Sequence, residues 1–200
     1  MDLRCARIEE ILPDEAAYRA AYGKLPGWRR RKCDKFRFAD DRRRSVAAWE
    51  LLRRMLGAKG VRAESLTVTE NEFGKPAFDP PIGLHFSISH AGERVMAAVA
   101  ETEVGCDVER IVPVDDGMLG ACLAADELTR LAAFSGPERD RAFVRLWVRK
   151  ESYAKAIGKG LVVGFPAVLA LDSPPEPGWA WRDYDYGDGY LGCAAVRILL

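Results

Sequence analysis

The chain has 200 residues, which corresponds to one large domain or two small ones. Hydrophobic residues make up 48% of it and charged residues 30%, a balance that excludes a disordered or fibrous chain. The longest purely apolar stretch, residues 95–100, is far too short to cross a bilayer, and the first residues lack the apolar segment of a secretory signal. We therefore expect a cytoplasmic protein without a membrane partner.

The five cysteines are odd in number and include no Cys-x-x-Cys pair, which argues against a disulfide framework and against a structural zinc site. The net charge of zero conceals an uneven distribution, because residues 24–44 contain ten basic side chains and only three acidic ones. Such a stretch attracts phosphates, either on nucleic acid or on a small ligand. A solvated run of charge beside a helix is the alternative, and the stretch alone does not decide between them.

The first predicted helix follows Asp40 and Asp41 and ends near Gly57 or Gly60, because Trp49 and Leu52 belong to a series of apolar residues at helical spacing. Strands are predicted at 65–69 and, after the turn Phe73-Gly74-Lys75-Pro76, at 84–89. Two further strands are predicted at 94–100 and 104–109. Their short connections predict an antiparallel meander of three strands.

In such a meander the first and third strands run in the same direction, which predicts that His90 lies near Asp107 and Glu109. The alternation of side chains places Asp107 and Glu109 on one face of their strand and Cys106 and Val108 on the other. Two neighbouring carboxylates repel each other unless a cation or a proton lies between them. Without a partner, the alternative is an exposed strand end where both are solvated.

A second helix is predicted over residues 141–157, with Gly158 as its C-terminal cap. Phe143, Trp147, Glu151 and Lys155 form a ridge at i, i+4 spacing, although Glu151 and Lys155 alone could be a surface ion pair. Further strands are predicted at 167–171, 179–184 and 190–198. A helix, then Lys-Gly, then a strand occurs in both halves of the chain, which weakly indicates two similar α+β lobes.

Four blocks follow one another along the chain: Gly-Lys-Pro at 74–76, Phe-Ser-Ile-Ser-His at 86–90, Gly-Cys-Asp-Val-Glu at 105–109 and Trp-Val-Arg-Lys-Glu-Ser-Tyr-Ala-Lys at 147–155. This series resembles the 4′-phosphopantetheinyl transferase superfamily, in particular its monomeric, two-lobed, surfactin-synthetase-activating (Sfp-like) type. The similarity runs from about residue 29 to residue 160. Cys106 departs from the family pattern, which has a branched aliphatic residue there.

The resemblance implies an α+β fold of two similar lobes with pseudo-twofold symmetry and an active site in the cleft between them. Residues 1–103 would form the N-terminal lobe that binds the nucleotide, and residues 104–200 the C-terminal lobe with the metal carboxylates and the carrier-protein contact. The implied reaction moves 4′-phosphopantetheine from coenzyme A to a serine of an apo acyl- or peptidyl-carrier protein and releases adenosine 3′,5′-bisphosphate. It would require Mg²⁺, with Mn²⁺ as a possible substitute.

Carried over residue by residue, the resemblance implies a metal site of Asp107, Glu109 and Glu151, and a catalytic set of Asp107, Glu151 and Lys155. Lys155 would also contact the pyrophosphate. The coenzyme A site would comprise Arg29, Lys32, Ser45, Gly74, Lys75, Ser89, His90 and Lys155. Glu151 is the preferred general base, either directly or through a metal-bound water, and Glu127 is the second candidate.

Residues 118–123 match the family helix that meets the carrier protein, although they could equally be core positions. Two alternative functions remain. A Mg²⁺-dependent nucleotide hydrolase or nucleotidyltransferase is disfavoured because the chain has no Gly-x-x-x-x-Gly-Lys-Ser/Thr loop. A non-enzymatic nucleic-acid-binding module could use residues 24–44, where Trp28, Phe36 and Phe38 interrupt the basic residues, but it would leave the carboxylates unexplained. We therefore expect a transferase with no nucleic-acid partner.

Overall fold

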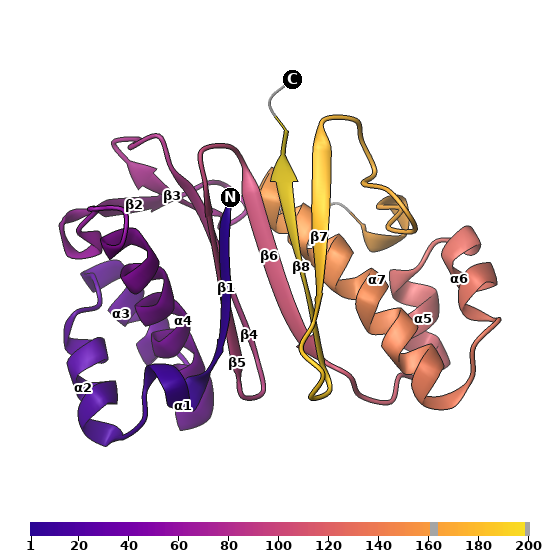
Figure 1. Ribbon diagram of the computed structural model, residues 1–200, viewed down its shortest axis with the longest axis horizontal. Helices are drawn as coiled ribbons and strands as arrows, with labels where there is room; N and C mark the ends of the chain where they lie inside the picture. Colours follow the sequence, from indigo (N-terminus) through magenta and orange to yellow (C-terminus); the bar gives the residue numbers. More distant parts are fainter. Residues whose placement is uncertain (161–163, 199–200) are drawn as a thin grey trace.

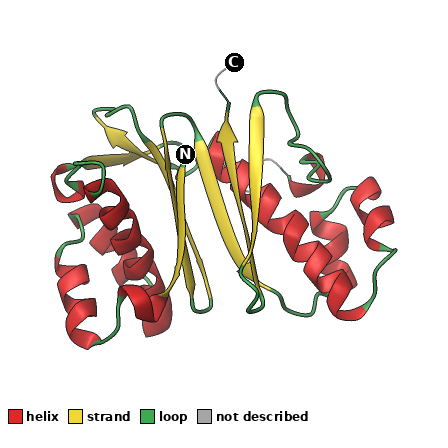
Figure 2. Cartoon of the chain, viewed as in Figure 1, coloured by secondary structure: helices red, strands yellow, loops and turns green. Residues whose placement is uncertain are grey.

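The computed structural model describes residues 1–160 and 164–198. Two β-sheets lie side by side in the middle of the molecule, and helices cover the outer face of each (Figure 1). The colouring by secondary structure in Figure 2 shows this helix, sheet, sheet, helix arrangement. The predicted α+β class is confirmed. Among the described residues, no helix is both long enough and apolar enough to cross a membrane.

The first lobe contains an antiparallel sheet in the order β1-β5-β4. Its strands are β1 (Asp2–Arg7), β4 (His85–Ala91) and β5 (Arg94–Ala100), and a separate hairpin consists of β2 (Thr67–Glu70) and β3 (Pro76–Asp79). Its helices are α1 (Ile8–Ile11), α2 (Glu15–Gly23), α3 (Gly27–Asp34), α4 (Ala39–Gly57) and the short 3₁₀ turn η1 (Ala63–Ser65). The long helix α4 packs on β4 and β5, as its apolar spacing requires.

The second lobe contains an antiparallel sheet in the order β6-β8-β7. Its strands are β6 (Val104–Arg110), β7 (Trp179–Asp185) and β8 (Tyr190–Arg197). Its helices are α5 (Asp116–Cys122), α6 (Ala125–Leu131), α7 (Gly136–Ile157) and the 3₁₀ turn η3 (Phe165–Ala167). The long helix α7 packs on β6 and β8, so each lobe places one long helix against one sheet.

The apolar run at 95–100 belongs to a strand that is buried on both faces. Val95, Val99 and their i+2 neighbours pack under α4, whereas Met96 and Ala98 face the second lobe. Alternate side chains of a strand point to opposite faces, so a strand between two packed layers must be apolar throughout. Because Met96 packs with Tyr190 and others between the sheets, the two lobes share a core as well as having their own.

The predicted three-strand meander is wrong at its third strand. β4 and β5 pair with each other, but β6 pairs with β8 of the second sheet, with Val104 opposite Val196. The turn after β5 is already bonded to β8, because Arg197 donates its backbone N–H to the Glu103 carbonyl at 2.9 Å. β6 nevertheless lies against β4, where the backbone N–H of Cys106 donates to Ser87 Oγ at 3.0 Å. The two sheets therefore meet through side chains at this point.

The predicted strand at 167–171 is also wrong, because η3 and irregular chain occupy this region. The backbone of this segment bonds to a buried ion pair and not to a neighbouring strand. The pair consists of Lys150 and Glu127, with 2.6 Å between Nζ and Oε2. Lys150 donates to the carbonyls of Phe165 and Val168, and Glu127 accepts from the backbone N–H of Ala170 at 2.8 Å. Buried backbone groups need partners, and here side chains provide them.

Both long helices end where the sequence predicts. α4 ends at Gly57, and α7 ends at Ile157 with Gly158 at φ +71°, the left-handed conformation that favours glycine after a helix. α7 begins at Gly136, five residues before the predicted start. Its first turn carries Pro137, which is tolerated there because the first helical N–H groups have no partner within the helix.

Candidate functional site

A cavity of about 450 Å³ lies between the two lobes and is lined by residues of both. It brings together every residue predicted for the metal and coenzyme A sites: Arg29, Lys32, Ser45, Gly74, Lys75, Ser89, His90, Asp107, Glu109, Glu151 and Lys155. His90 thus shares a cavity with Asp107 and Glu109, as predicted, although the reason is the contact between β4 and β6 and not a shared sheet. The individual roles of these residues stay predictions.

Asp107 of β6 is the most buried carboxylate of the cavity, with 2% of its surface exposed. Its Oδ1 accepts hydrogen bonds from Ser89 Oγ of β4 at 2.7 Å and from Lys155 Nζ of α7 at 2.5 Å. Lys155 also donates to Ser89 Oγ at 3.2 Å. Three elements from two lobes therefore meet at one carboxylate oxygen.

Gly105 explains how α7 comes close enough for this contact. A Cβ atom at Gly105 would lie 2.0 Å from the carbonyl oxygen of Ser152 and 2.4 Å from the backbone nitrogen of Ala156. Only glycine permits this separation between β6 and α7. Gly105 and Asp107 lie two residues apart and therefore on the same face of β6. The glycine that lets α7 approach thus stands next to the carboxylate that Lys155 of α7 contacts.

Glu109 and Glu151 complete the group of carboxylates. Burial and, after it, the neighbouring Asp107 charge raise the pKa of Glu109 to about 7. Burial also raises the pKa of Glu151. Burial acts to lower the pKa of Lys155, but the charges of Asp107 and Glu151 outweigh it and raise that pKa. The site therefore favours a bound cation or a proton among these carboxylates.

The donor set fits a hard divalent cation, which prefers oxygen ligands and carboxylates above all. Asp107 Oδ2 is buried and has no hydrogen-bond partner within residues 1–160 and 164–198, so one carboxylate oxygen is available. As placed, no three His, Cys, Asp or Glu side chains of the described chain are close enough to form a metal centre. The Lys155 ammonium donates a hydrogen bond to the other carboxylate oxygen, Oδ1 of Asp107.

Arg29 of α3 forms the cationic side of the cavity. It is 7% exposed, and its Nη2 donates to the hydroxyl of Ser45 at 2.9 Å and to the Ser45 carbonyl at 3.3 Å. In the described part of the chain no carboxylate is in ion-pair contact with it, and burial lowers its pKa. Lys32 differs, because its Nζ lies 3.1 Å from Glu70 Oε1. A buried guanidinium without a carboxylate is suited to an anionic ligand.

His90 lies at the end of β4 beside these cations. Burial, together with the charges of Arg29, Lys155 and Arg44, lowers the pKa of His90 to about 4. The imidazole is therefore neutral at neutral pH. An anion bound there would offset the positive charges and raise this pKa.

Gly74 and Lys75 belong to the turn between β2 and β3, which reaches the C-terminal end of α7. Gly74 has φ +81°, which favours glycine at this position. The Lys75 ammonium donates to the carbonyl of Ala156, and burial lowers its pKa to about 8. Lys75 therefore lines the cavity while its charge lies at the negative end of the α7 dipole.

Glu127 lies outside this cavity. It is fully buried in its ion pair with Lys150, and its carboxylate accepts the backbone N–H groups of Ala124 at 2.9 Å and Ala170 at 2.8 Å. The second candidate for the general base is therefore wrong on geometry. Of the segment 118–123, Met118, Gly120 and Ala121 are exposed, whereas Leu119, Cys122 and Leu123 are buried, so one side of it is core and the other side is open to a partner.

Sequence reasoning missed an aromatic lining of the cavity. Trp28, Phe36, Phe73 and Trp147 lie around the charged groups. Trp28 and Phe36 alternate with the basic residues of 24–44, and Phe73 precedes Gly74 in the turn. These aromatic residues among basic ones could have indicated the lining, because flat apolar side chains beside cations are suited to binding the base and phosphates of a nucleotide.

Comparison with known proteins bears on this site. Residues 103–182 match the family model described as the 4′-phosphopantetheinyl transferase superfamily. The predicted resemblance to this superfamily is confirmed. The superfamily segment contains Asp107, Glu109, Glu151 and Lys155, whereas the residues on the cationic side of the cavity precede it.

Several named 4′-phosphopantetheinyl transferases are similar to the chain. It is 31% identical to psf-1 of Bacillus pumilus over 143 residues, which are 71% of this chain and 61% of that protein. It is 34% identical to gsp of Aneurinibacillus migulanus over 62% of this chain and 52% of that protein. Sfp of Bacillus subtilis (strain 168) is 30% identical over 66% of this chain and 60% of its own length. The chain thus spans less than two thirds of these relatives.

Among solved structures, Thermotoga maritima holo-[acyl-carrier-protein] synthase (AcpS) superimposes on 50% of this chain and 64% of its own, with a TM-score of 0.41 and 20% identity. This likeness is too distant to carry an argument about the site. The assignment to the superfamily accordingly depends on the family segment and on the named transferases.

Proposed function

We propose that this chain transfers the 4′-phosphopantetheine group of coenzyme A to a serine hydroxyl of an apo acyl- or peptidyl-carrier protein. The observation that carries the proposal is the composition of the interlobe cavity. One side holds the buried Arg29, which lacks a carboxylate partner in the described chain, and the other holds the Asp107–Lys155 pair. A nucleotide with phosphates at both ends of its ribose would meet both sides.

In the proposed step, the serine oxygen forms a bond to the phosphorus that carries pantetheine. The bond from that phosphorus to the bridging oxygen of the pyrophosphate breaks, and adenosine 3′,5′-bisphosphate leaves with the electron pair. Such a transfer depends on position and on neutralised charge more than on covalent chemistry. Residues 1–103 would bind the nucleotide, and residues 104–200 would carry out the transfer.

On the nucleotide side, Arg29 would bind a phosphate, with Lys32 and Ser45 nearby. Gly74, Lys75 and the aromatic lining would contact the adenosine end. His90 would donate one N–H to a phosphate oxygen, with Ser89 beside it. On the transfer side, the Lys155 ammonium lies 2.5 Å from Asp107 and reaches the same space, so it would offset the charge that develops on the pyrophosphate.

Asp107, Glu109 and Glu151 would hold Mg²⁺, or Mn²⁺ in its place. The cation would neutralise charge on the pyrophosphate oxygens. The free oxygen Oδ2 of Asp107 and the pKa of about 7 at Glu109 support this assignment, because both indicate carboxylates that lack a sufficient positive partner.

Glu151 would accept the proton of the carrier serine. Burial raises its pKa, and a carboxylate with a raised pKa is a stronger base than an ordinary one at neutral pH. Its place one helical turn before Lys155 puts base and ammonium on the same side of α7. Glu127 cannot replace it, because its Oε2 binds Lys150 and the N–H of Ala124 while its Oε1 accepts the N–H of Ala170.

We further propose a monomer that acts in the cytoplasm. Both sides of the cavity come from one chain, so the site needs no residue from a second copy. The five cysteines of the structure are free, which fits a reducing compartment. Arginines of the basic stretch donate to the protein's own carbonyls, including Arg30 to Gly23 and Arg43 to Leu12, which leaves fewer of them for nucleic acid.

The test is intact-mass spectrometry of an apo carrier protein incubated with this protein, coenzyme A and Mg²⁺. We expect a gain equal to one phosphopantetheine group, which EDTA abolishes. The isosteric variant Asp107→Asn should lose at least about hundredfold in turnover, because it removes charge at the point where both lobes meet. No mass gain on acyl- and peptidyl-carriers, together with no heat of coenzyme A binding, would overturn the proposal.

A further inference from the structure

The turn between β2 and β3 is organised by a single side chain, that of Asn71. Its Oδ1 accepts the backbone N–H groups of Phe73 at 3.0 Å and Lys75 at 2.9 Å. Its Nδ2 donates across the lobe interface to the carbonyl of Gly158 at 2.8 Å, just after the end of α7. One amide therefore shapes the turn with its oxygen and attaches the turn to the other lobe with its nitrogen.

The end of α7 is built to receive this turn. Gly158 has φ +71°, and a Cβ atom there would lie 2.8 Å from Lys75 Cδ and 3.0 Å from Asn71 Nδ2. Lys75 adds a second contact by donating its ammonium to the Ala156 carbonyl. The last carbonyls of a helix have no partner within the helix, and here two side chains of the opposite lobe bind them.

The two sides of this contact carry different parts of the cavity. The turn contributes Phe73 and Gly74, while the last two turns of α7 contribute Glu151 and Lys155. We propose that Asn71 is a positioning residue, which sets the nucleotide-binding turn at a fixed distance from the transfer groups on α7. This inference rests on the proposed function. A displacement of about 1 Å can cost about a hundredfold in rate, so a single hydrogen bond between the lobes matters.

The two functions of the Asn71 amide can be separated by substitution. Asn71→Asp keeps an acceptor for the N–H groups of Phe73 and Lys75 but removes the donor to Gly158. Asn71→Ala removes both. The matched control is Glu72→Ala, because Glu72 is an exposed neighbour in the same turn and its side chain has no hydrogen bond or ion pair within the described chain.

The experiment measures kcat and KM for coenzyme A in the carrier assay, the melting temperature, and the hydrogen exchange of the turn amides. For Asn71→Asp we expect kcat to fall about tenfold or more while KM changes less than about threefold, since the turn is kept and only its position changes. Asn71→Ala should in addition raise KM and accelerate amide exchange at Phe73 and Lys75. Glu72→Ala should match the wild type in kcat, KM, melting temperature and amide exchange.

Failure of this inference differs from failure of the proposed function. If the wild type neither binds coenzyme A nor modifies a carrier, the function is wrong and the positioning role falls with it. If the wild type transfers phosphopantetheine and Asn71→Asp does so with an unchanged kcat, only the role of Asn71 is overturned. Equal losses in Asn71→Asp and Asn71→Ala, with KM raised in both, would also overturn it, because Asn71 would then act through the turn alone.

Discussion

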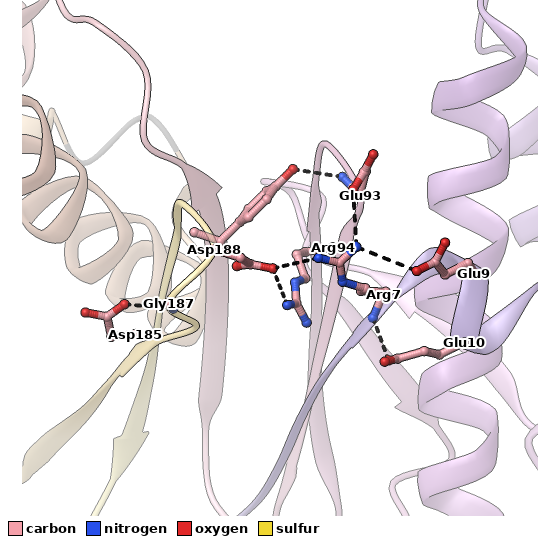
Figure 3. A network of polar contacts seen from close by, with 9 residues as sticks. Arg7, Glu9, Glu10, Glu93, Arg94, Asp185, Gly187 and Asp188 are labelled. Carbon is pink, nitrogen blue, oxygen red and sulfur yellow. Dashed lines mark hydrogen bonds and ion pairs between the residues drawn. The ribbon is translucent and has the colours of Figure 1, made fainter. Parts of the chain in front are cut away.

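Two sets of side-chain contacts, one at each end of the interface, join the two lobes. They differ in the elements that they connect. At the turn end, Asn71 and Lys75 bind the final carbonyls of α7. At the hairpin end, Asp188 in the turn after β7 accepts hydrogen bonds from both Arg7 of β1 and Arg94 of β5 (Figure 3). The first contact joins elements that line the cavity, whereas the second joins two sheet ends outside it.

The hairpin end also has a close backbone approach. The Tyr190 hydroxyl accepts the N–H of Glu93 at 3.1 Å, and a Cβ atom at Gly92 would lie 2.1 Å from that hydroxyl. Gly92 therefore corresponds to Gly158 at the turn end, since each is a glycine with positive φ where the other lobe comes close. We infer that the hairpin end contributes stability, while the turn end contributes stability and the geometry of the site.

The largest effect that separates the two ends should come from their glycines. Gly158→Ala and Gly92→Ala both place a side chain at positive φ, which costs about 1–2 kcal/mol, and both force a neighbouring side chain to move. We expect similar losses of unfolding free energy in urea. Only Gly158→Ala should also lower kcat, by about tenfold or more, because it displaces the turn from α7.

Tyr190→Phe in the Gly92→Ala background provides the control for this comparison. It removes the hydroxyl that the new Cβ would meet and should restore part of the lost stability without affecting kcat. Equal falls of kcat in the two glycine variants would contradict the distinction between the ends.

A smaller effect is expected from the ion pairs of the hairpin end. The hydrogen bond from Arg94, and then the charges of Arg94 and Arg7, lower the pKa of Asp188 below its usual range. Asp188→Asn should therefore lower the melting temperature by less than either glycine substitution, and added salt should reduce the difference from wild type. Turnover should stay within about twofold.

Asp172→Asn is the matched control, because Asp172 forms an ion pair of the same chemistry with Arg130 at a more exposed place. Its effect on melting should be smaller still. A marked loss of turnover in Asp188→Asn would show that the hairpin end also sets the geometry of the cavity.

The sequence predicts the site better than it predicts the sheets. Asp107, Glu151, Lys155 and His90 belong to short blocks whose spacing follows the period of one strand or one helix, and these periods are local properties of the chain. The assignment of β6 to the second sheet depends on β8, which lies more than eighty residues later. A short turn after β5 is compatible with either sheet, so no local signal could decide it.

The missing strand at 167–171 has a similar cause. Its apolar residues indicate burial, which is correct for Val168 and Ala170. The partners of its backbone, however, are the side chains of Lys150 and Glu127. A buried ion pair that replaces a strand depends on tertiary contacts, and it cannot be inferred from the alternation of apolar residues.

The effect that is smallest at neutral pH concerns His90, which lies two residues before Gly92 and therefore where the hairpin end meets the cavity. Its folded-state pKa is lowered to about 4, whereas an unfolded histidine has a pKa of about 6.5. Between these values the unfolded chain takes up a proton that the folded chain does not. The unfolding free energy should thus be highest above about pH 6.5 and fall with decreasing pH through this window, by up to about 2 kcal/mol near pH 5.

His90→Gln should make this fall shallower, which urea unfolding at several pH values can measure. An NMR titration of the two histidines then separates stability from binding, with the exposed His85 as the internal reference. Saturating adenosine 3′,5′-bisphosphate should raise the pKa of His90, because a bound phosphate offsets the charges of Arg29 and Lys155 that disfavour the imidazolium. An unchanged pKa at saturation would mean that the phosphate binds elsewhere and that His90 belongs functionally to the hairpin end.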